Sequence, residues 1–197
     1  MKILNYAFDK KRFESFIDAI IAIILTILVL ELRIPETDET HALSTQQQVA
    51  SLLHSFVSYI GSFLLIVGIW IDHHVLFLNL QKLTKSYILL NMLFILSLSL
   101  VPFTTAFAGS HSADSFAVAL LFVNYLIMNV IFGFLYWYAD WKKLLPHEFI
   151  QANRKTGIYS VIGILGLMAA IPIAYVNTYF SFCLGIIIFS GHLIKKS

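Results

Sequence analysis

The sequence predicts an all-α membrane protein with six transmembrane helices in each chain. Composition is the first indication: 59% of the 197 residues are hydrophobic and only 12% are charged, whereas an average soluble domain has about 25% charged residues. The mean hydropathy of +0.83 points the same way. The second indication is a series of apolar runs of roughly 20 residues, the length that crosses the hydrocarbon core as a helix. They lie at about 14–33, 50–78, 86–107, 116–138, 156–175 and 178–194.

We expect residues 1–197 to form a single transmembrane domain. The sequence has no linker long enough to divide it, no low-complexity tract and no convincing repeat between its halves. Pro146 breaks the loop at 139–155. Cys183 is the only cysteine, so an intrachain disulfide is excluded and no cysteine metal cluster is expected. The net charge of +2 gives no indication of a nucleic-acid partner.

The basic residues predict the orientation. With six spans, both termini lie on one side of the membrane, and 12 of the 13 lysines and arginines fall on that side, leaving only Arg33 opposite. The opposite loops contain acidic residues instead. The positive-inside rule therefore predicts a multi-pass protein of the cell membrane with both termini in the cytoplasm. The 12 residues are Lys2, Lys10, Lys11, Arg12, Lys82, Lys85, Lys142, Lys143, Arg154, Lys155, Lys195 and Lys196, and the opposite acids are Glu36, Asp38, Glu39 and Asp114.

The first span carries an aliphatic stripe. Ile23, Ile27 and Leu30 are spaced by four and three residues, which places them on one face of a helix, and Thr26 lies beside them. Such a stripe packs against other helices, touches lipid or lines a conduit. Periodicity alone leaves these interpretations open.

Charged residues begin the same span. Arg12 and Asp18 lie near its cytoplasmic end. Ionised groups at membrane depth are costly, so they usually turn inward and find partners. We expect Arg12 and Asp18 to reach each other or polar groups on adjacent helices, with snorkelling to the interface as the alternative.

The second span supplies candidate partners. Trp70 and His74 are four residues apart and share a face, whereas Asp72 and His73 point elsewhere. Consecutive residues diverge by about 100°, so we expect no metal site in this run. We expect a hydrogen-bonded network in which a histidine or Trp70 meets the first span, with an interfacial Trp/His belt as the alternative. Asn91 in the third span is a further buried polar candidate.

Two motifs resemble a known family. The first span begins R-x-x-x-F-x-D (Arg12, Phe16, Asp18), and the second contains W-x-x-H-H (Trp70, His73, His74). Together they resemble the prokaryotic relatives of the lysosomal potassium channel called transmembrane protein 175. The family hallmark is R-x-x-x-F-S-D, and Ile17 stands here in place of the serine. The length of six spans also fits the prokaryotic form, which has one repeat per chain where the animal protein has two.

The resemblance implies a potassium-selective, leak-type cation channel: a homotetramer in which four copies of the first helix line the pore. It implies Ile23 as the principal constriction, with Ile27 and Leu30 further out, and Thr26 at a position linked to potassium preference. The partners are then the other subunits, the bilayer and potassium ions, with no cofactor besides the permeant ion. The structural polar network would contain Arg12, Phe16, Asp18, Trp70, His73, His74 and Asn91.

A hydrophobic ring of this kind blocks by dewetting and passes a partly dehydrated ion when it opens slightly. It favours the cation that sheds water more cheaply, and potassium does so more readily than sodium. No span carries a row of arginines, so strong voltage dependence is not expected.

Two other classes compete with the channel interpretation. A secondary transporter would use broken helices, for which Gly61, Gly68, Gly163, Gly166 and Pro172 are candidates. An intramembrane enzyme would recruit Asp72, His73, His74 and the distant His54, but no G-x-S-x-G motif is present and these histidines do not converge by spacing. We therefore do not expect an enzyme.

Overall fold

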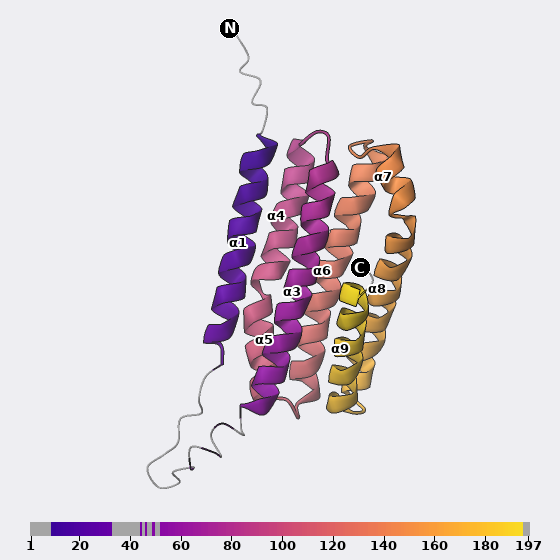
Figure 1. Cartoon of the computed structure of the whole chain (residues 1–197). Coiled ribbons are helices and arrows are strands. Elements are labelled where there is room, and N and C mark those ends of the chain that lie inside the picture. The colour runs from indigo at the N-terminus through magenta and orange to yellow at the C-terminus, as the bar shows by residue number, and fades with distance from the viewer. Residues whose placement is uncertain (1–8, 33–43, 45, 47–48, 50–51, 195–197) are drawn as a thin grey trace.

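The structure, a computed structural model, describes residues 9–32, 44, 46, 49 and 52–194, and in this part of the chain every regular element is a helix (Figure 1). The expected acidic loop residues Glu36, Asp38 and Glu39 and the basic residues Lys2, Arg33, Lys195 and Lys196 lie outside the described residues. The helices are α1 (Lys10–Leu30), α3 (Leu53–Asn79), α4 (Lys85–Ser99), α5 (Val101–Ser110), α6 (Ser115–Trp141), α7 (His147–Ala152), α8 (Arg154–Ala174) and α9 (Thr178–Ile194).

Side-chain caps explain where several helices begin. The Asp9 carboxylate accepts hydrogen bonds from the first backbone N–H groups of α1. Thr84 caps α4 and Asp114 caps α6 in the same way. An N-cap oxygen satisfies backbone donors that have no partner inside the helix, so these short polar side chains end the loops and start the spans.

The expected third span, 86–107, differs most from the observed helices. It is divided into α4 and α5 at Leu100, with Pro102 in the first turn of α5. Proline has no backbone N–H and its ring collides with the preceding turn, whereas it fits the first turn of a new helix. In the expected loop at 139–155, Pro146 precedes the short helix α7.

Four segments of the described chain are long and apolar enough to cross a membrane: α1, α3, Lys85–Ser110 across α4 and α5, and α6. Ser160–Ala174, within α8, is a shorter apolar segment. The candidate breaks for a transporter lie inside continuous helices, since α3 runs through Gly61 and Gly68, and α8 runs through Gly163, Gly166 and Pro172.

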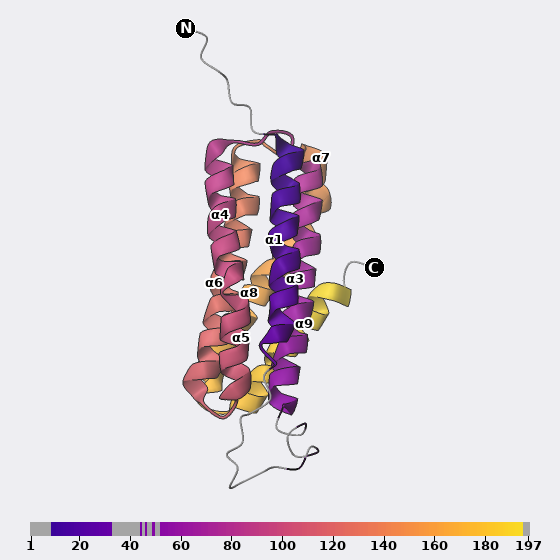
Figure 2. The same cartoon turned by 90° about the vertical axis from the view of Figure 1, so that its left-hand side faces the viewer.

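The helices form an elongated bundle in which α1 lies at one edge (Figures 1 and 2). It packs against α3, α4 and α5. On the other side, α8 packs against α6 and α9. The centre is filled by large apolar side chains such as Phe77, Phe94 and Phe122.

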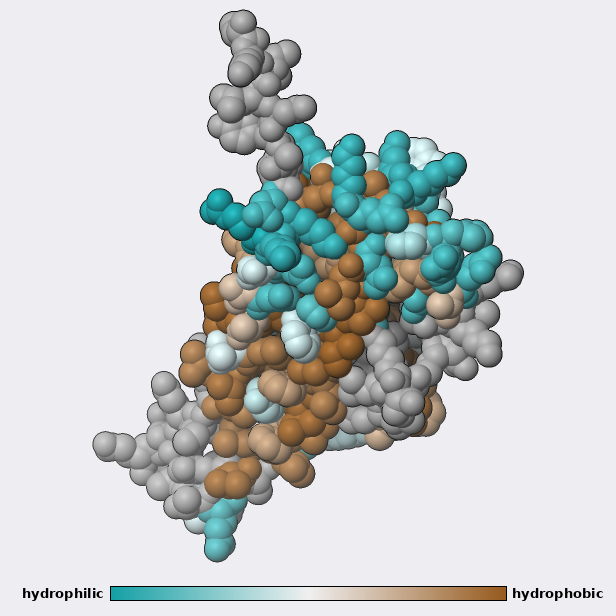
Figure 3. Space-filling model, turned by 45° about the horizontal axis from the view of Figure 1, so that its top comes forward, coloured by the Kyte–Doolittle hydropathy of each residue, from teal (hydrophilic) through white to brown (hydrophobic). Residues whose placement is uncertain are grey.

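Polar and apolar surfaces are separated along the bundle. Hydrophilic side chains gather at the end where α1 begins and α7 lies, and hydrophobic side chains cover the adjoining flank (Figure 3). The loops after α3 and α6 meet at this end, where the Gln81 N–H donates to the Leu144 carbonyl at 2.9 Å. The exposed lysines of these loops and of the start of α1 therefore share one end: Lys11, Lys82, Lys85, Lys142 and Lys143.

Hydrogen bonds between side chains join the central helices. Ser62 of α3 lies 2.7 Å from the Thr105 hydroxyl of α5 and also hydrogen-bonds the Tyr125 hydroxyl of α6. Asn124 of α6 donates to Thr104 of α5 at 3.2 Å. All five side chains are buried. Between helices in a membrane, such bonds contribute on the order of 1 kcal/mol each.

The contact between α5 and α3 depends on Gly109. A Cβ atom at this position would lie 2.8 Å from the Ser55 Cα, a backbone atom. We predict that Gly109→Ala lowers stability by about 1–3 kcal/mol, because the helices must move apart. Thermal unfolding in detergent measures the change. Gly133→Ala is the matched control, since no described atom outside its own stretch of helix would lie within 4 Å of the added Cβ; equal melting temperatures for the two variants would contradict the prediction.

Candidate functional site

One face of α1 is buried against the bundle. Ile17, Ile21, Ile24 and Leu28 are spaced by four, three and four residues and are at most 4% exposed. Four apolar side chains on one side of a helix fix its rotation, because turning it would expose them and bury other groups. Ile17 stands where the resembling family has serine, so this departure falls on the packing face.

The stripe predicted from the sequence lies on another side of α1. The exposed fractions are 56% for Ile23, 40% for Ile27 and 71% for Leu30. Thr26 is also exposed, and its hydroxyl donates to the Ile23 carbonyl at 2.8 Å. A single chain therefore leaves the predicted constriction residues uncovered by its own described helices.

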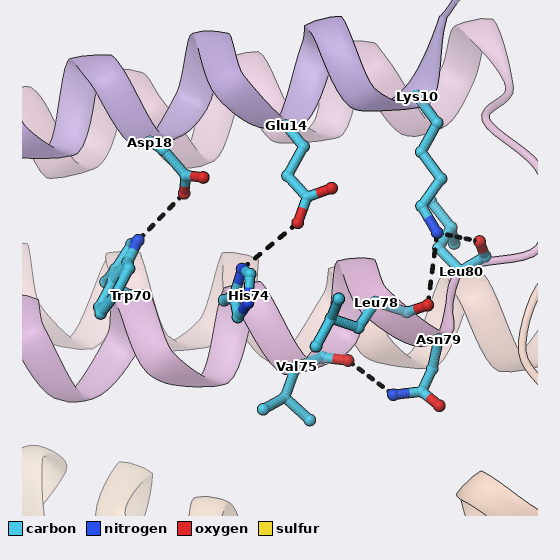
Figure 4. Close-up of polar contacts among 9 residues, drawn as sticks. All are labelled: Lys10, Glu14, Asp18, Trp70, His74, Val75, Leu78, Asn79 and Leu80. Atoms are coloured by element: carbon cyan, nitrogen blue, oxygen red, sulfur yellow. Dashed lines mark hydrogen bonds and ion pairs between the residues drawn. The ribbon is translucent and has the colours of Figure 1, made fainter.

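Polar contacts join α1 to α3 along one line, which we call the polar ladder (Figure 4). Lys10, Glu14 and Asp18 are spaced by four residues on α1, so they share a face. Their partners are Trp70, His74 and the Leu78 carbonyl on α3, and the carbonyl of Leu80, which directly follows α3. Partner numbers fall as the α1 numbers rise, so the two helices are antiparallel.

The contacts of the ladder are specific. The Trp70 Nε1–H donates to the Asp18 carboxylate at 3.0 Å, and Glu14 Oε1 lies 3.3 Å from His74 Nδ1. The Lys10 ammonium donates to the Leu80 carbonyl at 2.6 Å, one of the free carbonyls at the end of α3. The ladder therefore places a polar partner beside each of two carboxylates and a cation, which would be costly unpaired near the membrane.

His73 and Asn91 form a separate, fully buried pair between α3 and α4. His73 Nε2 lies 2.9 Å from Asn91 Oδ1, and the Asn91 amide donates to the Tyr87 carbonyl. The imidazole stacks on Phe77 and Phe94. This pair holds the inner face of α3 and does not touch the polar ladder.

The three consecutive residues Asp72, His73 and His74 point in three directions. Asp72 lines a cavity of about 210 Å³ on the side of α6 and α8, His73 meets α4, and His74 meets α1. His54, at the other end of α3, stacks on Tyr179. These four residues do not assemble into one reactive group.

Arg12 and Phe16 lie apart from the ladder within the chain. Both side chains are exposed, and Arg12 makes no side-chain hydrogen bond or ion pair with another described residue. Phe16 is 50% exposed and stacks on Phe13. Lys10 and Glu14 belong to the ladder but were not predicted from the sequence, although their four-residue spacing to Asp18 was the available signal.

One group of side chains has the composition of a metal site. Ligand atoms of Glu14, Asp18 and His74 all lie within 4.8 Å of one another. Each of the three side chains is partly buried. Two carboxylates and an imidazole are ligand types that bind zinc.

Comparisons with known proteins agree with the resemblance drawn from the two motifs. The family model described as endosomal/lysosomal potassium channel TMEM175 matches residues 12–102, which include both motifs. A potassium channel of Chryseobacterium is 31% identical over 186 residues, covering 90% of this chain and 91% of the relative. A potassium channel of Streptomyces collinus is 28% identical, covering 86% of this chain and 84% of the relative.

A longer relative is the human protein named endosomal/lysosomal proton channel TMEM175. It is 28% identical over 193 residues, which cover 92% of this chain but 37% of the human protein. Among solved structures, a lysosomal potassium-selective channel TMEM175 homolog from Chamaesiphon minutus superposes with a TM-score of 0.82 at 19% identity, covering 94% of this chain and 97% of that one. This likeness shows a shared fold. Motifs, sequence identity over nine-tenths of the chain and fold therefore agree, and the chain belongs to the family of the endosomal/lysosomal potassium channel TMEM175.

Proposed function

We propose that the chain is one subunit of a potassium-selective, leak-type cation channel, a homotetramer in which four copies of α1 surround a central pore. The observation that carries the proposal is the position of α1: it lies at the edge of the bundle, buried on one face, with Ile23, Ile27 and Leu30 uncovered. The bacterial relatives named potassium channel support the choice of ion.

The proposed constriction is a ring of four Ile23 side chains. An apolar ring offers an ion no ligand, so it empties of water and blocks when narrow, and conducts when slightly wider. Ile27 and Leu30 form further rings one and two turns along α1. Thr26 supplies hydroxyl oxygens between them, which favours the less strongly hydrated potassium ion.

The polar ladder holds each pore helix on its own subunit. Trp70 and His74 of α3 contact Asp18 and Glu14 of α1, while the His73–Asn91 pair fixes α3 against α4. Arg12 and Phe16, exposed in the single chain, are available to a neighbouring subunit. In this proposal, all of these residues serve structure and none serves catalysis.

We further propose the membrane topology. One channel domain over residues 1–197 crosses the cell membrane six times, with both termini in the cytoplasm. The gathering of exposed lysines at one end of the bundle supports this orientation. The channel uses no cofactor and no nucleic acid. Its partners are its own copies, the bilayer and potassium ions, and it is not an enzyme, as expected in an ion channel family.

A secondary transporter is the alternative function. Transporters of this kind often bind substrate where helices are interrupted, whereas α3 and α8 run unbroken through the glycines and proline that suggested such breaks. Flux that saturates and follows a proton gradient would favour a transporter. The mammalian relatives are named proton channels, so vesicle pH is followed together with potassium.

We predict that Ile23→Asn raises potassium flux several-fold, because an amide wets the constriction. The measurement is potassium-driven flux into liposomes that contain the purified protein. Val29→Asn is the matched control: Val29 is 45% exposed on the same helix, but about 120° away from Ile23. Equal flux through wild type and Ile23→Asn would rule out Ile23 as the gate.

We predict that Thr26→Val lowers potassium-over-sodium selectivity, because valine keeps the shape of threonine but loses its oxygen. The reversal potential under bi-ionic conditions should move toward zero. Thr26→Ser keeps the hydroxyl and should retain most of the selectivity. A reversal potential unchanged by Thr26→Val would remove the threonine from the mechanism.

We predict that Asp18→Asn weakens the assembly, because the Trp70 indole loses a charged acceptor. Hydrogen bonds to charged groups contribute about 1.5–3 kcal/mol. The heat resistance of tetramers in detergent reports the loss, with Asp140→Asn, an exposed position at the end of α6, as control. Tetramers of Asp18→Asn that survive heating as well as wild type would make Asp18 peripheral.

A further inference from the structure

The polar ladder brings together three side chains that are possible metal ligands. Glu14 and Asp18 from α1 and His74 from α3 bring their ligand atoms within 4.8 Å of one another, and Glu14 Oε1 lies 3.3 Å from His74 Nδ1 (Figure 4). Tetrahedral zinc with bonds of about 2.0–2.1 Å places its ligands about 3.3 Å apart. One pair already has this spacing, and the ligand atom of Asp18 lies within 4.8 Å of both others.

The environment of the His74 Nδ1 atom indicates that His74 can act as a metal ligand. Its Nδ1 atom is enclosed and has no hydrogen-bond partner among the described residues, and Glu14 Oε1 lies 3.3 Å from it. When this nitrogen carries no proton, its lone pair can bind a metal. The ring stacks on Trp70 with centroids 6.0 Å apart, and this contact orients the nitrogen toward α1.

The neighbouring side chains leave carboxylate oxygens of the ladder available to an ion. The Trp70 indole N–H occupies one oxygen of Asp18 and leaves the other for an ion, the arrangement by which second-shell donors orient metal ligands. The cation of the ladder, Lys10, is bound to the Leu78 and Leu80 carbonyls and does not pair with Glu14. Two carboxylates therefore face one imidazole without a neutralising side chain of the ladder between them.

We propose that Glu14, Asp18 and His74 form a binding site for a zinc-like divalent transition metal that joins α1 to α3. Three protein ligands leave a fourth position for water. Magnesium and calcium are not expected to bind tightly, because they require six or more oxygen ligands. If α1 lines the pore, as the proposed function holds, the ion clamps the pore helix to its support and slows conduction.

Isothermal titration with zinc chloride tests the site itself. The full chain is purified in detergent after removal of any histidine tag, and wild type should bind about one zinc per subunit. His74→Gln and Glu14→Gln should each weaken binding at least tenfold. His147→Gln is the matched control, because His147 is exposed and its ring hydrogen-bonds Gln151; it should bind zinc as wild type does.

A wild type that gives no zinc heat overturns the site, and so do His74→Gln and Glu14→Gln variants that bind as tightly as wild type. If His74→Gln does not fold, the Glu14→Gln variant alone decides the test. Titration with magnesium chloride is the control for the choice of ion. Potassium flux tests the clamp: zinc should slow wild type and spare His74→Gln. Flux unaffected by zinc overturns the clamp. Vesicles that conduct no potassium at all overturn the proposed function, and the titration still decides the metal site.

Discussion

The buried aliphatic face of α1 controls the arrangement of the candidate pore. Ile17, Ile21, Ile24 and Leu28 pack into the bundle and are almost inaccessible. Because a helix is rigid, this packing also determines which residues remain outside. Ile23 directly precedes Ile24 and lies about 100° around the helix from it, so it is turned away from the described helices of its own chain. The uncovered stripe is a consequence of the covered one.

Packing sets the rotation of α1 about its own axis. The polar ladder also sets the position of α1 along α3 and its antiparallel direction. Apolar contacts tolerate small shifts along a helix, whereas Trp70–Asp18 and His74–Glu14 match particular residues. The same residues leave two carboxylates beside an imidazole nitrogen that has no hydrogen-bond partner among the described residues. One set of contacts can therefore fix the helix and offer a metal site at the place where the helix is held.

Relatives with modest sequence identity share this fold because many packing positions, and not a few particular residues, hold it together. The Chamaesiphon minutus structure retains the arrangement at 19% identity, since aliphatic side chains of similar volume replace one another at small cost. Ile17 is a larger change: it occupies the serine position of the resembling family and fills a site with 0% exposure. The chain spans 91% of its Chryseobacterium relative and 37% of the human protein.

Composition and periodicity alone determined that the chain is helical, apolar and divided into spans, because the membrane requires long apolar helices whose backbone groups are satisfied internally. The four-residue spacings placed Trp70 with His74 and Ile23 with Ile27 on common faces. Tertiary structure decided which faces meet. It paired Glu14 with His74, directed His73 away from the polar ladder to Asn91, and left Arg12 and Phe16 exposed. It also divided the third span near Pro102. A periodic pattern states which residues share a side of a helix, but contact with a particular neighbour depends on the rotation and height of both helices, and these follow from packing between distant parts of the chain.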